Sequence, residues 1–180
     1  MSHYLVAVIH REDQDIKDLL APFDEAKAKT ADEAKWDWYE VGGRFRTNLR
    51  NKRGQIVTSC RLDDIDFEPR SDIYDECKDF YEVVVNGKEK KPGVDYFTLF
   101  KPEYYKDHYG SADYFAKCEA SFSTYAVLTP DGKWHESAPM GWFGCSAATP
   151  EQFKAWYDGY EKLIKDLDKD LIMTIVDCHI

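Results

Sequence analysis

The chain has 180 residues, of which 43% are hydrophobic and 32% charged, enough for one domain with a sizeable core that needs no disulfide. No apolar run approaches the roughly 18 residues of a membrane span, so we expect a soluble protein. Acidic residues number 34 against 24 basic ones, and the net charge of −10 disfavours direct binding of nucleic acid.

The first third of the chain begins with a strand pattern. Residues 4–9 form a nearly continuous apolar, β-branched run, typical of a strand buried on both faces. No basic leader precedes this run, so we expect a cytoplasmic location. Helical spacing follows over residues 11–23, and residues 26–35 are helical or irregular.

The next segment concentrates aromatic and arginine side chains. Residues 36–41 alternate like a strand, and Gly42-Gly43 predicts a bulge or turn before residues 44–49. Residues 51–54 predict a hairpin turn into residues 55–60.

The middle of the chain carries weaker patterns. Residues 61–70 are acidic and predict an exposed connection. Residues 72–85 predict a helix that gives way to a strand at the valine run 83–85. The tyrosine-rich residues 102–117 predict a helix broken at Gly110, with its aromatics used for packing.

The last third carries several agreeing signals. Residues 122–128 predict a strand, 129–132 a type I turn, and 133–136 the paired strand. Thr149, Pro150 and Gln152 predict the start of a helix closed by a capping box. Residues 171–176 predict a second buried strand.

These elements predict a single α+β domain over residues 1–180, with a mostly antiparallel sheet and helices on one face. A strand that is apolar on both faces needs a neighbour on each side, so we expect the N- and C-terminal strands at the centre of the sheet. The element order suits a ferredoxin-like core with residues 61–118 as an insertion.

Four segments carry a resemblance to a known group of proteins. Residues 38–45 (WYEVGGRF), 125–136 (YAVLTPDGKWHE), 140–144 (MGWFG) and 176–180 (VDCHI) resemble segments of small uncharacterised proteins from bacteriophages and prophages. The resemblance implies a viral context in the cytoplasm of a bacterial host, where small accessory proteins often blunt host defence. It assigns no catalytic residue.

The aromatic and glycine-containing segments predict a binding site for a nucleotide-like small molecule. Tryptophan rings can stack on a nucleobase, and arginines beside Gly-Gly amides can hold a phosphate. The alternative is that the tryptophans are packing residues and the glycines make a bulge and a turn. The candidate ligand-binding residues are Trp36, Trp38, Tyr39, Gly42, Gly43, Arg44, Arg46, Trp134, His135 and Trp142.

Histidines and cysteines offer a second kind of site. His10 and His179 end the first and last strands, so parallel pairing would bring them to one sheet edge with His135, Cys145, Asp177 or Cys178, whereas antiparallel pairing would separate them. Such a set suits zinc or iron, or a histidine base with a cysteine nucleophile. No local ligand pair such as H-x-x-x-H is present, and we expect no cofactor.

The favoured function is binding rather than catalysis. We expect a phage-type accessory protein that inhibits a host defence protein, an anti-CRISPR or similar, through an acidic surface that includes Asp63, Asp64, Asp66 and Glu68. The first alternative is sequestration of a nucleotide-like molecule in the aromatic pocket. The second is an enzyme that depends on a metal or on Cys/His chemistry.

Overall fold

The protein is described by a computed structural model, which covers residues 2–139 and 148–180. The chain divides into two compact units. The first comprises residues 1–66, 124–148 and 159–180, and the second comprises residues 67–123 and 149–158. Each unit is described separately below.

The first unit is built on an open sheet of six strands, ordered β2-β6-β1-β4-β5, with β3 also paired to β6. Among the strand pairings of the described residues, β1–β4 is parallel and the other four are antiparallel, so the sheet is mixed and mostly antiparallel. The predicted α+β class and the central placement of the terminal strands are confirmed, whereas the ferredoxin-like topology stays a prediction. The strands are β1 (His3–His10), β2 (Trp38–Val41), β3 (Ser59–Arg61), β4 (Ala126–Leu128), β5 (Trp134–Glu136) and β6 (Ile172–His179).

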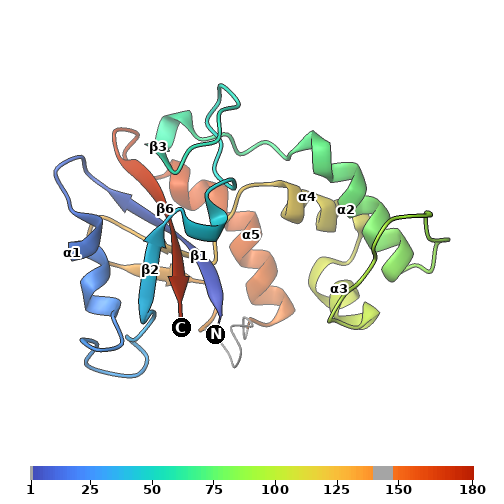
Figure 1. Cartoon of the computed structure of the whole chain (residues 1–180), viewed down its shortest axis with the longest axis horizontal. Helices are drawn as coiled ribbons and strands as arrows, with labels where there is room; N and C mark the ends of the chain where they lie inside the picture. Colours follow the sequence, from blue (N-terminus) through green and yellow to red (C-terminus); the bar gives the residue numbers. More distant parts are fainter. Residues whose placement is uncertain (1, 140–147) are drawn as a thin grey trace. The chain divides into compact units, whose positions relative to one another are not determined.

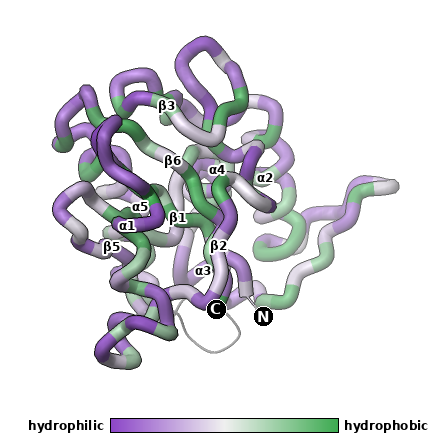
Figure 2. Tube along the Cα trace, turned by 60° about the vertical axis from the view of Figure 1, so that its left-hand side comes forward, coloured by the Kyte–Doolittle hydropathy of each residue, from purple (hydrophilic) through white to green (hydrophobic). Residues whose placement is uncertain are grey.

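The two central strands run antiparallel along their whole length, from His3 opposite His179 to His10 opposite Ile172. Both strands are buried over seven of their eight residues, which is why their sequences are apolar on both faces. Figure 1 shows the two chain ends side by side at one end of this pair. Figure 2 shows hydrophobic colour along β6 and hydrophilic colour on the surrounding loops.

The two faces of this sheet carry different side chains. Tyr4, Val6 and Val8 of β1 and Val176 and Cys178 of β6 contribute to one hydrophobic cluster. Leu20 of the short helix α1 (Ile16–Leu20) is buried in the same cluster, so α1 packs on this face. Alternation therefore places His3, Asp177 and His179 on the opposite face.

The predicted first helix is shorter in the structure than in the sequence pattern. Asp15 caps α1 by accepting a hydrogen bond from the Lys17 amide, and a 3₁₀ turn, η1 (Ala21–Phe23), follows at Pro22. The predicted hairpin turn at residues 51–54 is confirmed by the hydrogen bond from Gly54 N–H to Asn51 C=O, 2.8 Å. A further 3₁₀ turn, η3 (Leu62–Asp64), follows β3.

The second unit contains α2 (Ser71–Val84), α3 (Pro102–Tyr109) and α4 (Ala112–Ala120). Its core cluster includes Tyr81, Tyr105, Ala112 and Phe115. The predicted helix break is confirmed at Gly110, which has a φ of 71°.

The strand predicted at residues 83–85 is wrong, because α2 continues through Val83 and Val84. Val83 is buried, and Val84 and Val85 pack against the core of this unit. This burial outweighs the small intrinsic penalty of β-branched residues in a helix.

Helix α5 (Pro150–Lys165) begins as the sequence predicts. Thr149 Oγ1 accepts a hydrogen bond from the Gln152 amide (3.3 Å), and Gln152 Oε1 accepts one from the Thr149 amide (2.9 Å). This reciprocal pair confirms the capping box. No helix among the described segments combines the length and apolar character that a bilayer span requires.

Candidate functional site

The Gly42-Gly43 step brings the backbone onto the side chain of Asp177. Gly42 and Gly43 have φ values of 72° and 45°, which favour glycine. A Cβ at Gly43 would lie 2.5 Å from Asp177 Cβ and 2.6 Å from its Oδ2. The glycine therefore allows the amide of Arg44 to donate a hydrogen bond to Asp177 Oδ2 over 3.0 Å.

Asp177 is almost fully buried, with 1% of its surface exposed, and both of its oxygens are engaged. Oδ1 accepts a hydrogen bond from His3 Nδ1 at 2.8 Å, and Oδ2 accepts the Arg44 amide. A buried carboxylate needs such partners to offset its lost hydration.

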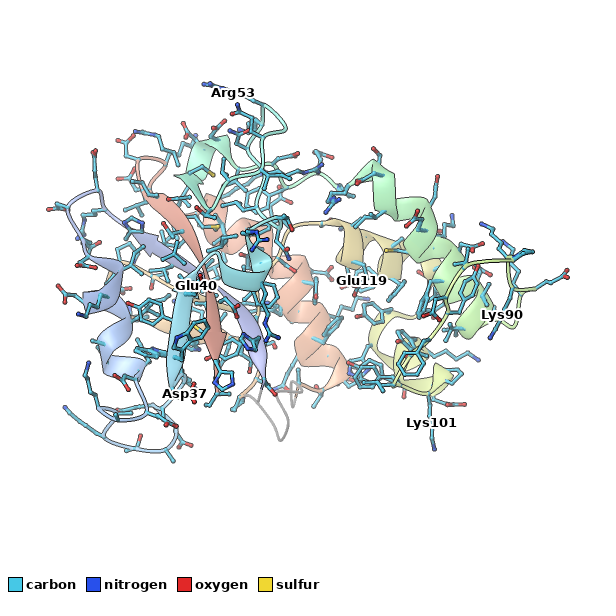
Figure 3. All side chains as sticks on the ribbon, in the orientation of Figure 1. Asp37, Glu40, Arg53, Lys90, Lys101 and Glu119 are labelled. Carbon is cyan, nitrogen blue, oxygen red and sulfur yellow. The ribbon has the colours of Figure 1, made fainter. Side chains whose placement is uncertain are left out.

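A second histidine–carboxylate pair lies beside the first. His179 Nδ1 is 2.5 Å from Asp37 Oδ1, just before β2. Figure 3 labels Asp37 at the end of β2 and Glu40 within this strand. The two imidazole rings meet edge to face with their centroids 5.0 Å apart.

Trp38 completes a row of three rings on one face of the sheet. In register, His179 lies between His3 of β1 and Trp38 of β2. The rings of His3 and Trp38 lie 6.1 Å apart in a T-shaped arrangement, and Trp38 is 47% exposed. Trp38 is therefore the exposed ring of the row, whereas His179 is buried at 8% exposure.

Among the described residues, each imidazole has one of its two nitrogens engaged. Nδ1 of His3 and Nδ1 of His179 are engaged by carboxylates, and Nε2 of neither ring bonds to another described residue. A carboxylate that fixes Nδ1–H orients the ring and leaves Nε2 to accept or donate a proton. We call the residues His3, Asp37, Trp38, Asp177 and His179 the histidine face.

The arginines that follow the glycines are exposed. Arg44 and Arg46 form no ion pair with any acid in the described ranges 2–139 and 148–180. The amide of Gly42 donates to the carbonyl of Ile175 over 2.8 Å, and that of Arg44 to Asp177. The amides of Gly42 and Arg44 are therefore engaged within the protein, and the predicted phosphate contacts of this segment stay a prediction.

The structure divides the predicted aromatic pocket between two faces of the sheet. Trp36, Tyr39 and Trp134 belong to or pack on the hydrophobic cluster that contains Tyr4, on the face opposite Trp38. The indole N–H of Trp36 donates to Leu20 C=O (3.1 Å), and that of Trp134 donates to Glu136 Oε2 (2.8 Å).

These contacts give Trp36, Tyr39 and Trp134 a packing role, which is the alternative raised by the sequence. Trp142 and Cys145 lie outside the described residues.

The remaining histidine and cysteine candidates lie apart from the histidine face. Antiparallel pairing places His10 at the other end of β1, where its two nitrogens contact Arg11 C=O (2.8 Å) and Thr174 Oγ1 (2.9 Å). His135 lies on β5, with Nε2 3.4 Å from Thr129 Oγ1.

Cys178 is buried on the opposite face from His179, and burial raises the pKa of its thiol, which opposes formation of the thiolate nucleophile. In the part of the chain that the structure describes, no three His, Cys, Asp or Glu side chains form a group that could hold a metal ion.

The acidic segment is partly neutralised by neighbouring cations. Asp63 lies 3.7 Å from Arg61 Nε, and Asp66 lies 3.5 Å from Arg50. Asp63 and Glu68 are exposed, and Asp64 is half-buried. The role of these four residues in binding a partner stays a prediction.

His3 and Asp37 were absent from the sequence-based candidates. The signal that could have found His3 is the strand register. If two central terminal strands pair antiparallel, residue 3 comes to lie opposite residue 179. Asp37 has no comparable signal, because it lies outside the regular strand and approaches His179 only after β2 has paired with β6.

Comparisons with models of protein families, with curated proteins and with solved structures found no match.

Proposed function

We propose that the histidine face binds a small, nucleotide-like phosphoester and hydrolyses it by acid–base catalysis. One observation carries the proposal. Two adjacent imidazoles are each held at Nδ1 by a different carboxylate, and no residue of the ranges 2–139 and 148–180 bonds to Nε2 of either ring. A pair of oriented imidazoles supplies the base and the acid that hydrolysis of a phosphoester needs.

The proton transfers can be assigned to the two rings as a pair. Nε2 of one imidazole takes a proton from water as the water oxygen bonds to phosphorus. Nε2 of the other, protonated imidazole gives its proton to the ester oxygen as the phosphorus–oxygen bond breaks. Asp177 and Asp37 fix the orientation of the two rings through their Nδ1 atoms.

Neighbouring side chains favour a ligand that carries both a ring and a phosphate. Trp38 offers an exposed ring on the same face, and stacking on one base contributes about 1–3 kcal/mol. Arg44 and Arg46 supply guanidinium groups suited to phosphate oxygens. The net charge of −10 disfavours binding of a long nucleic acid.

The test uses the full chain with bis(4-nitrophenyl) phosphate and with 2′,3′-cyclic and 3′,5′-cyclic AMP. We expect turnover of at least one phosphoester with a bell-shaped dependence of kcat/KM on pH. His3→Gln and His179→Gln should each lower kcat by at least about 100-fold, the usual contribution of a general acid or base. Trp38→Leu should raise KM for the nucleotides about 10-fold through lost stacking.

His135→Gln is the matched control and should retain full activity, because His135 lies on β5 away from the histidine face. Circular dichroism and Tm establish that each variant is folded. Absence of turnover for all three compounds, or full activity in folded His3→Gln and His179→Gln proteins, would refute the proposal.

A second candidate is inhibition of a host defence protein by a phage-type accessory protein. The excess of acidic residues supports it, since an acidic surface can occupy the basic nucleic-acid groove of such a partner. Asp63 and Glu68 are both exposed on the surface of the chain.

A further inference from the structure

The second unit contains an open cavity of about 510 Å³ whose lining combines aromatic rings with carboxylates. Helices α2, α3 and α4 and residues 94–100 contribute to its walls. Seven aromatic side chains line it, and so do the carboxylates of Glu76, Asp95 and Glu119. None of the described residues that line it is Lys, Arg or His.

The rings of the cavity face several directions. Phe100 stacks on Tyr104 with centroids 4.2 Å apart, whereas Tyr105 and Phe115 meet edge to face at 5.7 Å. Phe80 stacks on Phe115 at 5.9 Å. Rings at different angles present several negative faces to one ligand, and a cation is attracted to such faces.

The carboxylates of the cavity have no cationic partner among the described residues, although lysines lie close by. Lys88 and Lys91 both pair with Asp79, at 3.5 and 3.0 Å, and Asp79 does not line the cavity. Glu119 accepts a hydrogen bond from the neutral hydroxyl of Tyr109 at 3.1 Å. The lining therefore has an excess of negative charge.

We propose that this cavity binds a small organic cation, an alkylammonium or arylalkylammonium whose apolar body lies among the rings and whose charge faces Glu119. The volume suits a small-molecule ligand, for which pockets span about 300–1,000 Å³. Val94 and Phe100 of the lining are exposed by 51% and 43%, so the apolar body of a ligand would cover surface that now faces water.

Protonation of Glu119 provides an independent signature. Glu119 is open to solvent, yet the packed atoms around its carboxyl raise its pKa above the ordinary value, and the Tyr109 hydrogen bond opposes the rise. A bound cation favours the ionised carboxylate. Affinity should therefore increase as pH rises through the pKa of Glu119, with release of a proton on binding in that range.

The test is calorimetric titration of the full chain with (2-phenylethyl)trimethylammonium and with its neutral isostere, in which carbon replaces the nitrogen. The cation should bind at least about 10-fold more tightly than the isostere. Heats measured in buffers of different ionisation enthalpy should reveal the released proton, and Glu119→Gln should abolish that release.

Phe100→Leu and Phe97→Leu form a matched pair of exposed residues, of which only Phe100 lines the cavity. Phe100→Leu should weaken binding of the cation more than binding of the isostere, and Phe97→Leu should leave both unchanged. The proposal is overturned if the cation fails to bind at millimolar concentration, binds no better than the isostere, or is equally sensitive to both substitutions.

Discussion

Gly43 and Asp177 depend on each other at the level of single residues. The absence of a side chain at Gly43 lets the chain pass against the Asp177 carboxylate, and the carboxylate in turn binds His3 and the Arg44 amide. The Gly-Gly step is visible in the sequence, but the reason for it, close contact with Asp177, is visible only in the structure. These glycines therefore make room for a side chain of the protein itself, the Asp177 carboxylate.

Gly43→Ala should lower the free energy of unfolding much more than Gly54→Ala. Both glycines have positive φ values, 45° and 75°, but a Cβ at Gly54 would meet nothing within 4 Å. Backbone strain alone costs about 1 kcal/mol, and the clash with Asp177 adds about 1–3 kcal/mol of overpacking.

Urea unfolding of the two variants measures this difference. Equal losses would show that Asp177 moves aside without cost. A larger loss for Gly43→Ala than for Gly54→Ala, together with a displaced His3 resonance in NMR, would confirm the coupling between the turn and the histidine.

At the scale of helices and strands, sequence patterns correctly predicted the features that depend only on neighbouring residues. The capping box at Thr149, the turn at residues 129–132 and the helix break at Gly110 depend on neighbours within a few residues. The structure contains all three, the turn being closed by the hydrogen bond from Gly132 N–H to Thr129 C=O. The valine run at 83–85 was predicted incorrectly because burial against Tyr81 and its neighbours decides its structure. The pairing of His179 with Asp37 depends on strand register, which no local pattern encodes.

Thr149→Ala should destabilise the start of α5 by about 1 kcal/mol, the usual cost of a lost N-cap. The substitution leaves the Gln152 amide without its side-chain acceptor. Hydrogen exchange of the first-turn amides and the free energy of unfolding measure the effect. Thr149→Ser keeps the hydroxyl and serves as the control, so an equal loss in both variants would contradict a capping role.

At the scale of the whole molecule, two compact units carry two different kinds of candidate site. The histidine face combines imidazoles with carboxylates and an exposed indole, whereas the cavity of the second unit combines aromatic rings with carboxylates. The sequence drew attention to Trp38, Arg44 and His179 but assigned the tyrosines of residues 102–117 to packing alone. Tyr104 and Tyr105 also line the cavity, and this arrangement requires α2, α3 and α4 together.

Charge reversal at Asp63 and Asp64 should weaken any inhibition of a host defence protein. The expected result is a loss of protection when phage is plated on bacteria that carry an active CRISPR system and express Asp63→Lys/Asp64→Lys. Purified components should show the largest loss of affinity at low salt, where charges are least screened.

Glu12→Lys/Asp13→Lys changes the net charge by the same amount at another exposed position and should retain protection. An equal loss of protection in the two variants would show that the overall charge matters and that the acidic segment has no special role.

The pairing of β1 with β6 also has a consequence during synthesis on the ribosome. His3 and Asp177 are 174 positions apart, so the first strand leaves the ribosome long before its central partner has been translated. During that interval the edge of β1 that β6 will cover is available for pairing, and until β4 has been translated the other edge is available too. Such open edges favour aggregation and engagement by chaperones. Slower translation of the middle of the chain should therefore reduce the yield of folded protein rather than improve it.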